Sequence, residues 1–98
     1  MTRKVRLSRL AESDLVDIWR HTAGQWSHEQ ADAYLDASDA ALRRLAVHPE
    51  VGARRDGVGD GYRVLFVGGH AVYYRVASSA VLVVRVLHGR MDPERHLL

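Results

Sequence analysis

The amino-acid sequence predicts a small α+β domain of order β-α-α-β-β-β, in which an antiparallel sheet has a helical hairpin packed on one face. Two observations carry this prediction. Apolar residues recur every three to four positions in the first half of the chain, as in amphipathic helices. Short valine-rich runs separated by turn residues follow in the second half, as in antiparallel strands. The length of 98 residues fits one domain, residues 1–98.

The chain as far as Gly24 predicts a strand and a first helix. Residues Lys4 to Leu7 alternate between polar and apolar side chains, which suits a short strand. Ser8 is expected to cap the helix that follows, because a serine hydroxyl accepts a hydrogen bond from a free amide of the first turn. Gly24 is expected to end or weaken this helix. The apolar face of this first helix is formed by Leu15, Ile18, Trp19, Thr22 and Trp26.

A second helix is predicted directly afterwards. Ser27 with Gln30 three residues later is a capping-box pattern, and His48-Pro49 stops the helix. Acidic residues come early and Arg43 and Arg44 late, as the helix dipole favours. Two amphipathic helices with a short joint form an antiparallel hairpin. The apolar face of the second helix consists of Ala31, Tyr34, Leu35, Ser38, Ala41, Leu42 and Leu45.

The second half predicts a three-stranded meander. Residues Glu50 to Gly61 are rich in glycine and charge, so we expect an irregular surface loop there. Gly68-Gly69 is a tight-hairpin signal, and residues 77–80 form a second break of hairpin length. Residues Asp92 to Leu98 are expected to form a short polar tail. The expected strands are Tyr62–Val67, Ala71–Val76 and Val81–Leu87.

Composition excludes several classes of site. The chain has no cysteine, so disulfides, zinc–thiolate sites and thiol nucleophiles are absent. No signal peptide and no apolar run of membrane-spanning length occurs, and we expect a cytoplasmic protein without a membrane partner. The six histidines lack metal-ligand spacing, and no phosphate loop, nucleophile elbow or dinucleotide motif is present. We therefore expect no metal, no cofactor and no catalytic residues. Glu12, Asp14 and Asp17 are interpreted as the solvated face of the first helix.

Charge is distributed unevenly along the chain. Residues 1–49 hold seven Lys or Arg and seven Asp or Glu, whereas residues 61–91 hold four arginines and no acid. An acid-free half favours an anionic partner such as nucleic acid or an acidic protein surface. The alternative is that these arginines are ordinary solvated strand residues.

The run from Val81 to Asp92 is the most informative part of the meander. Strand alternation is expected to place Val81, Val83, Arg85 and Leu87 on one face and the residues between them on the other. Arg85 then lies on a mostly buried strand and needs a partner for its charge. His88 and Arg90 flank Gly89 where the strand leaves the sheet. In the neighbouring strand, at least one of Tyr73 and Tyr74 is expected to pack against the helices.

Over nearly its whole length the chain resembles the ParE branch of the RelE/ParE toxins. The resemblance lies in the order and spacing of five segments. They are R-L-S-R-L-A-E-S-D-L-V-D-I-W (6–19), Q-A-D-A-Y-L-D-A (30–37), G-Y-R-V (61–64), H-A-V-Y-Y-R-V (70–76) and V-R-V-L-H-G-R-M-D-P (84–93).

The resemblance implies a toxin of a type II toxin–antitoxin system that inhibits DNA gyrase by binding. It also implies a ParD-like ribbon-helix-helix antitoxin, through which alone the toxin meets operator DNA. Candidate antitoxin contacts are Trp19 and Tyr34. The antitoxin peptide could add to the sheet as a strand, or lay an amphipathic helix in a groove beside these two residues. The candidates for target contact are Arg63, Arg75, Arg85, His88 and Arg90.

Two alternatives stay open. RelE relatives cut messenger RNA on the ribosome, a reaction that needs a general base and a general acid. Here the only lysine is Lys4, and residues 53–68 contain no Lys, Glu or His to supply the base. The other alternative is a nucleic-acid-binding module without toxicity.

Overall fold

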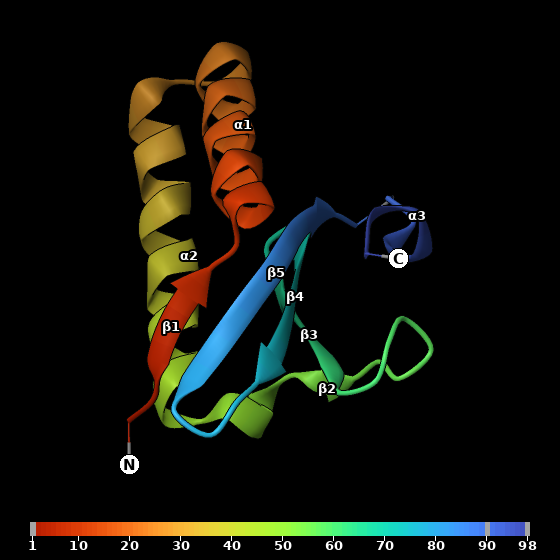
Figure 1. The fold of residues 1–98 in the computed structure, drawn as a ribbon. Coiled ribbons are helices and arrows are strands. Elements are labelled where there is room, and N and C mark those ends of the chain that lie inside the picture. Colours follow the sequence, from red (N-terminus) through yellow and green to blue (C-terminus); the bar gives the residue numbers. More distant parts are fainter. Residues whose placement is uncertain (1, 90, 98) are drawn as a thin grey trace.

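A computed structural model describes residues 2–89 and 91–97 and contains a five-stranded sheet of order β1-β5-β4-β3-β2 (Figure 1). The helical hairpin lies on one side of this sheet, as predicted. The elements are β1 (Lys4–Leu7), α1 (Arg9–Gln25), α2 (His28–Val47), the 3₁₀ helix η1 (Pro49–Val51), β2 (Ala53–Arg54), β3 (Tyr62–Val67), β4 (His70–Val76), β5 (Ala80–His88) and α3 (Pro93–Leu97).

Two segments are more ordered than the sequence analysis expected. Residues 50–61, predicted as an irregular loop, contain most of η1 and the two-residue strand β2, which pairs antiparallel with β3. The expected polar tail contains α3 instead. These three elements are too short for hydrophobic periodicity to reveal them, and tertiary contacts hold them in place.

The direction of β1 differs from the one expected in a wholly antiparallel sheet. β1 pairs with β5 in parallel, with Val5 opposite Val81 and Leu7 opposite Val83. Parallel neighbours need a long crossover connection, and the helical hairpin and the other strands lie between these two in sequence. The sheet is therefore mixed. β3 to β5 form the expected antiparallel meander, and β2 is an additional antiparallel strand beside β3.

The caps of the two long helices agree with the prediction. The hydroxyl of Ser8 accepts a hydrogen bond from the amide of Ala11, and that of Ser27 accepts one from Gln30, each over 3.0 Å. α1 ends at Gln25, one residue beyond Gly24. No helix in the part of the chain that the structure describes is long and apolar enough to cross a membrane.

Each face of the sheet carries its own apolar cluster. On the helical side Ala11, Leu45, Tyr74, Val81 and Val83 form the main core with their neighbours. Tyr74 is thus the tyrosine that packs toward the helices. On the outer side, a second cluster comprises Val58, Val64, Ala71, Tyr73 and Leu87, with Tyr62 and Leu97 packed against it. The loop after β2 and helix α3 therefore cover part of the outer face.

A bulge in β5 changes which of its residues share a face. Tyr73 is opposite Arg85 while Tyr74 is opposite Val83, so Val84 is an extra residue. Val86 consequently joins the main core, and Leu87 joins the outer cluster. The expectation that Val81, Val83, Arg85 and Leu87 lie on one face is wrong, because regular alternation stops at the bulge.

Candidate functional site

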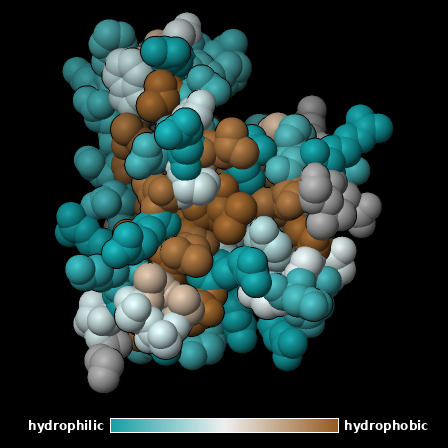
Figure 2. Space-filling model, viewed as in Figure 1, coloured by the Kyte–Doolittle hydropathy of each residue, from teal (hydrophilic) through white to brown (hydrophobic). Residues whose placement is uncertain are grey.

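An open apolar groove runs along β1 between the two long helices. It consists of two adjoining hollows of about 430 Å³ each, which share Leu7. Charged side chains of both signs stand at its rim, among them Glu12 and Arg20 at one end and Asp39 and Arg43 at the other. Figure 2 shows the apolar surface gathered on this face of the molecule. The apolar lining comprises Val5, Leu7, Leu15, Val16, Trp19, Leu35, Leu42, Ala46 and Val47.

Trp19 lies in this groove. Its indole Nε1 donates a hydrogen bond of 3.0 Å to the Asp32 carboxylate of α2. Its ring also lies in tilted contact with His28, with 5.3 Å between the ring centroids. These two contacts fix a half-buried aromatic ring across the helical hairpin, and such a ring is well suited to anchor a partner.

Tyr34 does not line this groove. Its hydroxyl donates a hydrogen bond of 2.8 Å to the carbonyl of Val67 and is bonded to Nδ1 of His70. Its ring lies over the β3–β4 turn, where Gly68 adopts a φ of 58° and a side chain would meet the ring. Partial burial raises the pKa of the phenol. The structure therefore separates the two antitoxin-binding candidates, and Tyr34 joins α2 to the sheet.

Asp14 and Arg85 form an ion pair at the edge of β5. Two nitrogens of the guanidinium, Nε and one Nη, donate to the two carboxylate oxygens over 2.8 and 2.9 Å. Both side chains are only 13% exposed. Hydrogen bonding to Asp14 raises the pKa of Arg85, against the lowering effect of burial. Arg85 thus has the partner that the sequence predicted, whereas the interpretation of Asp14 as a solvated side chain is wrong.

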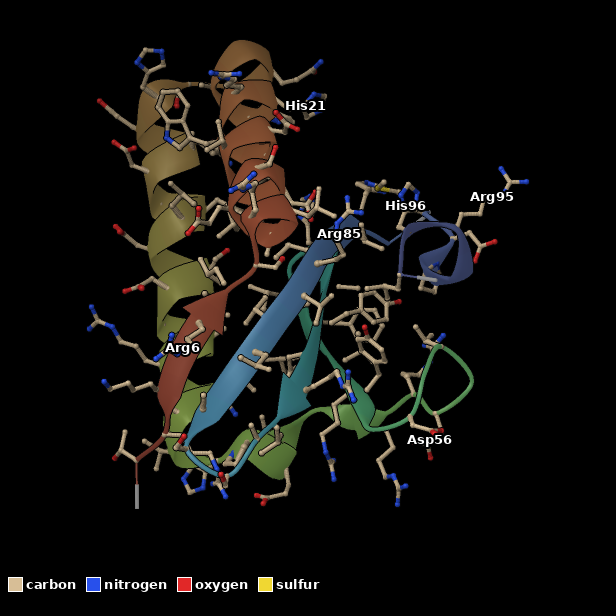
Figure 3. The ribbon with its side chains drawn as sticks, in the orientation of Figure 1. Arg6, His21, Asp56, Arg85, Arg95 and His96 are labelled. Carbon is tan, nitrogen blue, oxygen red and sulfur yellow. The ribbon has the colours of Figure 1, made fainter. Side chains whose placement is uncertain are left out.

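The same carboxylate helps to close the open edge of the sheet. β1 covers β5 only as far as Val83, and beyond that point no strand in the described part of the chain lies beside this edge of β5. Asp14 accepts a hydrogen bond from the amide of Val86, and the Ser8 hydroxyl donates to the carbonyl of Val84. Arg85 also donates to the carbonyl of His96 in α3 (Figure 3). This cluster joins α1, β5 and α3, and it protects an exposed edge.

A cleft of about 480 Å³ beside this cluster collects three histidines. His21 comes from α1, His70 from β4 and His88 from β5, with Asp14 and Asp17 also in the lining. The rings of His70 and His88 meet edge to face, 5.6 Å apart between centroids. Sequence reasoning missed this site because its members come from three separate elements and share no spacing signal.

His70 joins the cleft to the second long helix. Its Nδ1 is hydrogen-bonded to the hydroxyl of Tyr34 in α2. Burial lowers the pKa of His70, and the charges of His88 and His21 lower it further. The lowered pKa favours the neutral form of the His70 imidazole. Within residues 2–89 and 91–97, no three acidic or histidine side chains are arranged to hold a metal ion.

The four predicted target contacts that the structure describes do not form one surface. Arg63 donates to the carbonyls of Gly52 and Glu50 over 2.8 and 3.3 Å and so braces η1 and β2. Arg85 is bound by Asp14, as described above. Arg75 is exposed, with its guanidinium 5.4 Å from the centroid of the Tyr62 ring. His88 lies in the histidine cleft, and Arg90 lies outside the described residues.

Comparison with known sequences gives a family. Residues 5–93 match the family described as the ParE toxin of the type II toxin–antitoxin system parDE. The chain is 40% identical to Toxin ParE1 of Mycobacterium tuberculosis (strain H37Rv) over 98 residues, covering 99% of this chain and 100% of the relative. It is also 40% identical to Toxin ParE1 of Caulobacter vibrioides, covering 94% of this chain and 95% of that one.

Solved structures agree on the fold. A chain of the chromosomal ParDE system from P. aeruginosa superposes with a TM-score of 0.77 at 20% identity, covering 89% of this chain and 96% of that chain. A chain of the RelBE2 toxin–antitoxin complex from Mycobacterium tuberculosis gives a TM-score of 0.55, also at 20% identity, over 90% of this chain and 99% of the other. With a family match over most of its length and two close relatives of the same name, this chain belongs to the ParE toxin family of type II toxin–antitoxin systems.

Proposed function

We propose that this ParE-family toxin acts by binding, that its target is DNA gyrase, and that a ParD-like antitoxin holds it inactive. The antitoxin would carry a ribbon-helix-helix domain, and the complex would meet operator DNA only through that domain. Family membership supports the toxin role. The open apolar groove is the observation that supports a bound partner.

The groove suits an amphipathic helix. Apolar side chains line both hollows, and soluble monomers seldom leave contiguous apolar surfaces of this kind uncovered. A helix laid along β1 would insert apolar residues spaced by three or four positions beside Trp19 and Leu35. Its polar flanks would meet Glu12 and Arg20 at one end and the Asp39–Arg43 pair at the other.

A pair of matched substitutions tests this docking mode. Val16 and Leu10 are both exposed apolar residues of α1, at 48% and 56%, but Val16 lines the groove and Leu10 does not. Val16→Asp should weaken antitoxin binding at least tenfold in calorimetry, because a carboxylate would have to be buried against the partner. Leu10→Asp should leave the affinity within about twofold. Equal losses from both variants would contradict docking in the groove.

The target is tested by two assays run on the same toxin preparation. We expect the toxin to inhibit supercoiling of relaxed plasmid by gyrase, and added antitoxin to restore it. Messenger RNA on translating ribosomes should stay intact. Cleaved messenger with unaffected supercoiling would overturn the choice of target and of mechanism together.

One observation favours a second candidate, an RNA-cleaving activity. Residues 53–68 contain no Lys, Glu or His to act as a base, but the fold brings His70 and His88 together in one cleft, with 5.6 Å between their ring centroids. Such a pair has the groups needed to remove a proton from a 2′-hydroxyl and to protonate the leaving oxygen. Cleavage that is lost in His70→Gln and in His88→Gln would support this candidate, and gyrase inhibition that survives both substitutions would then be a separate activity.

A further inference from the structure

The outer sheet face carries, beside the second apolar cluster, a row of arginines that neither the apolar groove nor the histidine cleft uses. Strand register places Leu82 of β5 opposite Arg75 of β4, and Arg75 opposite Tyr62 of β3. The amide of Arg55 donates to the carbonyl of Tyr62, which continues the row on the next segment. At the other end Arg6 of β1 is the partner of Leu82. We call Arg6, Leu82, Arg75, Tyr62 and Arg55 the arginine row.

The row lies on the outer face, away from the helical hairpin. Val81 and Val83, the neighbours of Leu82, are buried in the main core, so Leu82 points outward and is 40% exposed. Residues directly opposite one another in a sheet share a face, and the row therefore follows Leu82. Helix α3 lies beside the far end of β5 (Figure 1), and near the β4–β5 turn Arg75 and Leu82 are both exposed.

The cations of the row form no ion pair with the side chains that the structure describes. Arg6, Arg55 and Arg75 are all exposed. The ion pairs among the described residues involve Arg43, Arg54 and Arg85, and no carboxylate is paired with an arginine of the row. The contact that Arg75 does make is with the face of the Tyr62 ring, at 5.4 Å. That contact orients a guanidinium plane without removing its charge.

We propose that the arginine row binds single-stranded nucleic acid. Arginines alternate with an aliphatic and an aromatic side chain across neighbouring strands, which is the combination of cations and stacking surfaces that single strands require. With strands about 4.8 Å apart, the row spans roughly 19 Å and meets a few nucleotides. An acidic protein surface would match the charges but would leave the Tyr62–Arg75 stack without a planar partner.

Salt dependence gives the most direct test. Anisotropy of a labelled 12-nucleotide single-stranded DNA of mixed sequence is measured with the purified toxin between 50 and 200 mM salt. Three phosphate contacts predict a slope of log K against log salt of about −2, since each contact on a single strand contributes about −0.7. Arg55→Gln with Arg75→Gln should bring the slope to about −0.7. The matched control is Arg9→Gln with Arg44→Gln, which removes the same charge from exposed helical positions and should keep the slope near −2.

Stacking is tested separately. Tyr62→Leu keeps apolar contact with the outer cluster but removes the aromatic face, and affinity should fall by roughly tenfold, as expected when one stacked base is lost. Unchanged thermal unfolding of each variant shows that the fold is retained. A slope that is the same in the row variant and in its control, tighter binding to a poly-glutamate peptide than to the oligonucleotide, or no binding at all would overturn the proposal. The assay contains neither gyrase nor antitoxin, so its failure leaves the proposed function untouched.

Discussion

Arg75 and Arg85 lie in similar sequence surroundings, and the structure uses them in opposite ways. Each is followed by valine in a mostly apolar strand. Arg85 is nearly buried and bound by Asp14 and the carbonyl of His96, whereas Arg75 is exposed above the Tyr62 ring. The difference arises because β1 stops at Leu7, so α1 must supply the groups that cover the rest of the β5 edge. The role of a strand arginine thus depends on what its neighbours bring to it.

Removing Asp14 should produce the largest effect. Asp14→Ala leaves the Arg85 guanidinium nearly buried without its counter-charge and also removes the acceptor for the amide of Val86. We expect the free energy of unfolding to fall by about 3 kcal/mol in urea denaturation. Arg75→Ala should change it by about 0.5 kcal/mol or less, as for an exposed side chain.

A double variant sharpens this comparison. Asp14→Ala with Arg85→Met removes both charges while keeping an apolar stem on the strand, and it should recover part of the loss. Equal stabilities of Asp14→Ala and Arg75→Ala would show that the two arginines are used alike, against the structure.

Two tyrosines on opposite faces of the sheet allow a similar comparison of a buried and a less buried group, with a smaller expected effect on stability. The buried hydroxyl of Tyr74 donates to the carbonyl of Pro49 over 2.7 Å and accepts from the amide of Gly52 over 2.8 Å. Tyr74→Phe leaves two buried backbone groups without their partner, and should destabilise the protein by about 2 kcal/mol. Tyr62→Phe, on the outer face, should cost less than about 0.5 kcal/mol by the same denaturation measurement. A larger loss from Tyr62→Phe would contradict this assignment of the hydroxyls.

These contrasts also show which features of the structure can be predicted from the sequence. Helical spacing, the caps at Ser8 and Ser27 and the Gly68-Gly69 turn depend on local chemistry, and the structure agrees with the elements expected from them. The bulge at Val84 and the parallel pairing of β1 depend on distant parts of the chain and leave no local pattern. The need of Arg85 for a partner was predictable from its strand, but its identity was not, because Asp14 looks like any other polar residue of an amphipathic helix.

The candidate sites, too, were predictable only where they depend on local sequence. Trp19 stands out in the sequence as a large aromatic residue on a helix face, and it does line the apolar groove. Tyr34 is also a large aromatic residue on a helix face, yet its hydroxyl donates a hydrogen bond to the carbonyl of Val67, beside the β3–β4 turn. The histidine cleft could not be anticipated, since only the folded chain brings α1, β4 and β5 together.

Lowering the pH should reduce the stability that His70 contributes in the histidine cleft, and it should not affect the arginine row. The pKa of His70 is lower in the folded protein than in the unfolded chain, so the unfolded state binds the proton more readily. Neutral His70 makes its full contribution to the free energy of unfolding above about pH 6.5, which is the pKa of a free histidine. This contribution is lost as the pH falls below that value. We expect the free energy of unfolding to fall between pH 7 and 5, and to fall less steeply in His70→Gln. Parallel curves for the two proteins would contradict a depressed pKa.

The smallest effect is expected at the pair between Asp39 and Arg43 on α2. The distance between carboxylate and guanidinium is 3.0 Å, close to the 2.8 Å of the Asp14–Arg85 pair, but the side chains are 60% and 81% exposed instead of 13%. Water and salt screen the exposed charges, so Asp39→Asn should change the free energy of unfolding by about 0.3 kcal/mol, and by less in 1 M salt. If Asp39→Asn cost as much as Asp14→Ala, distance would govern the energy of these pairs. We expect burial to govern it, because only a charge removed from water loses its solvation when its partner is taken away.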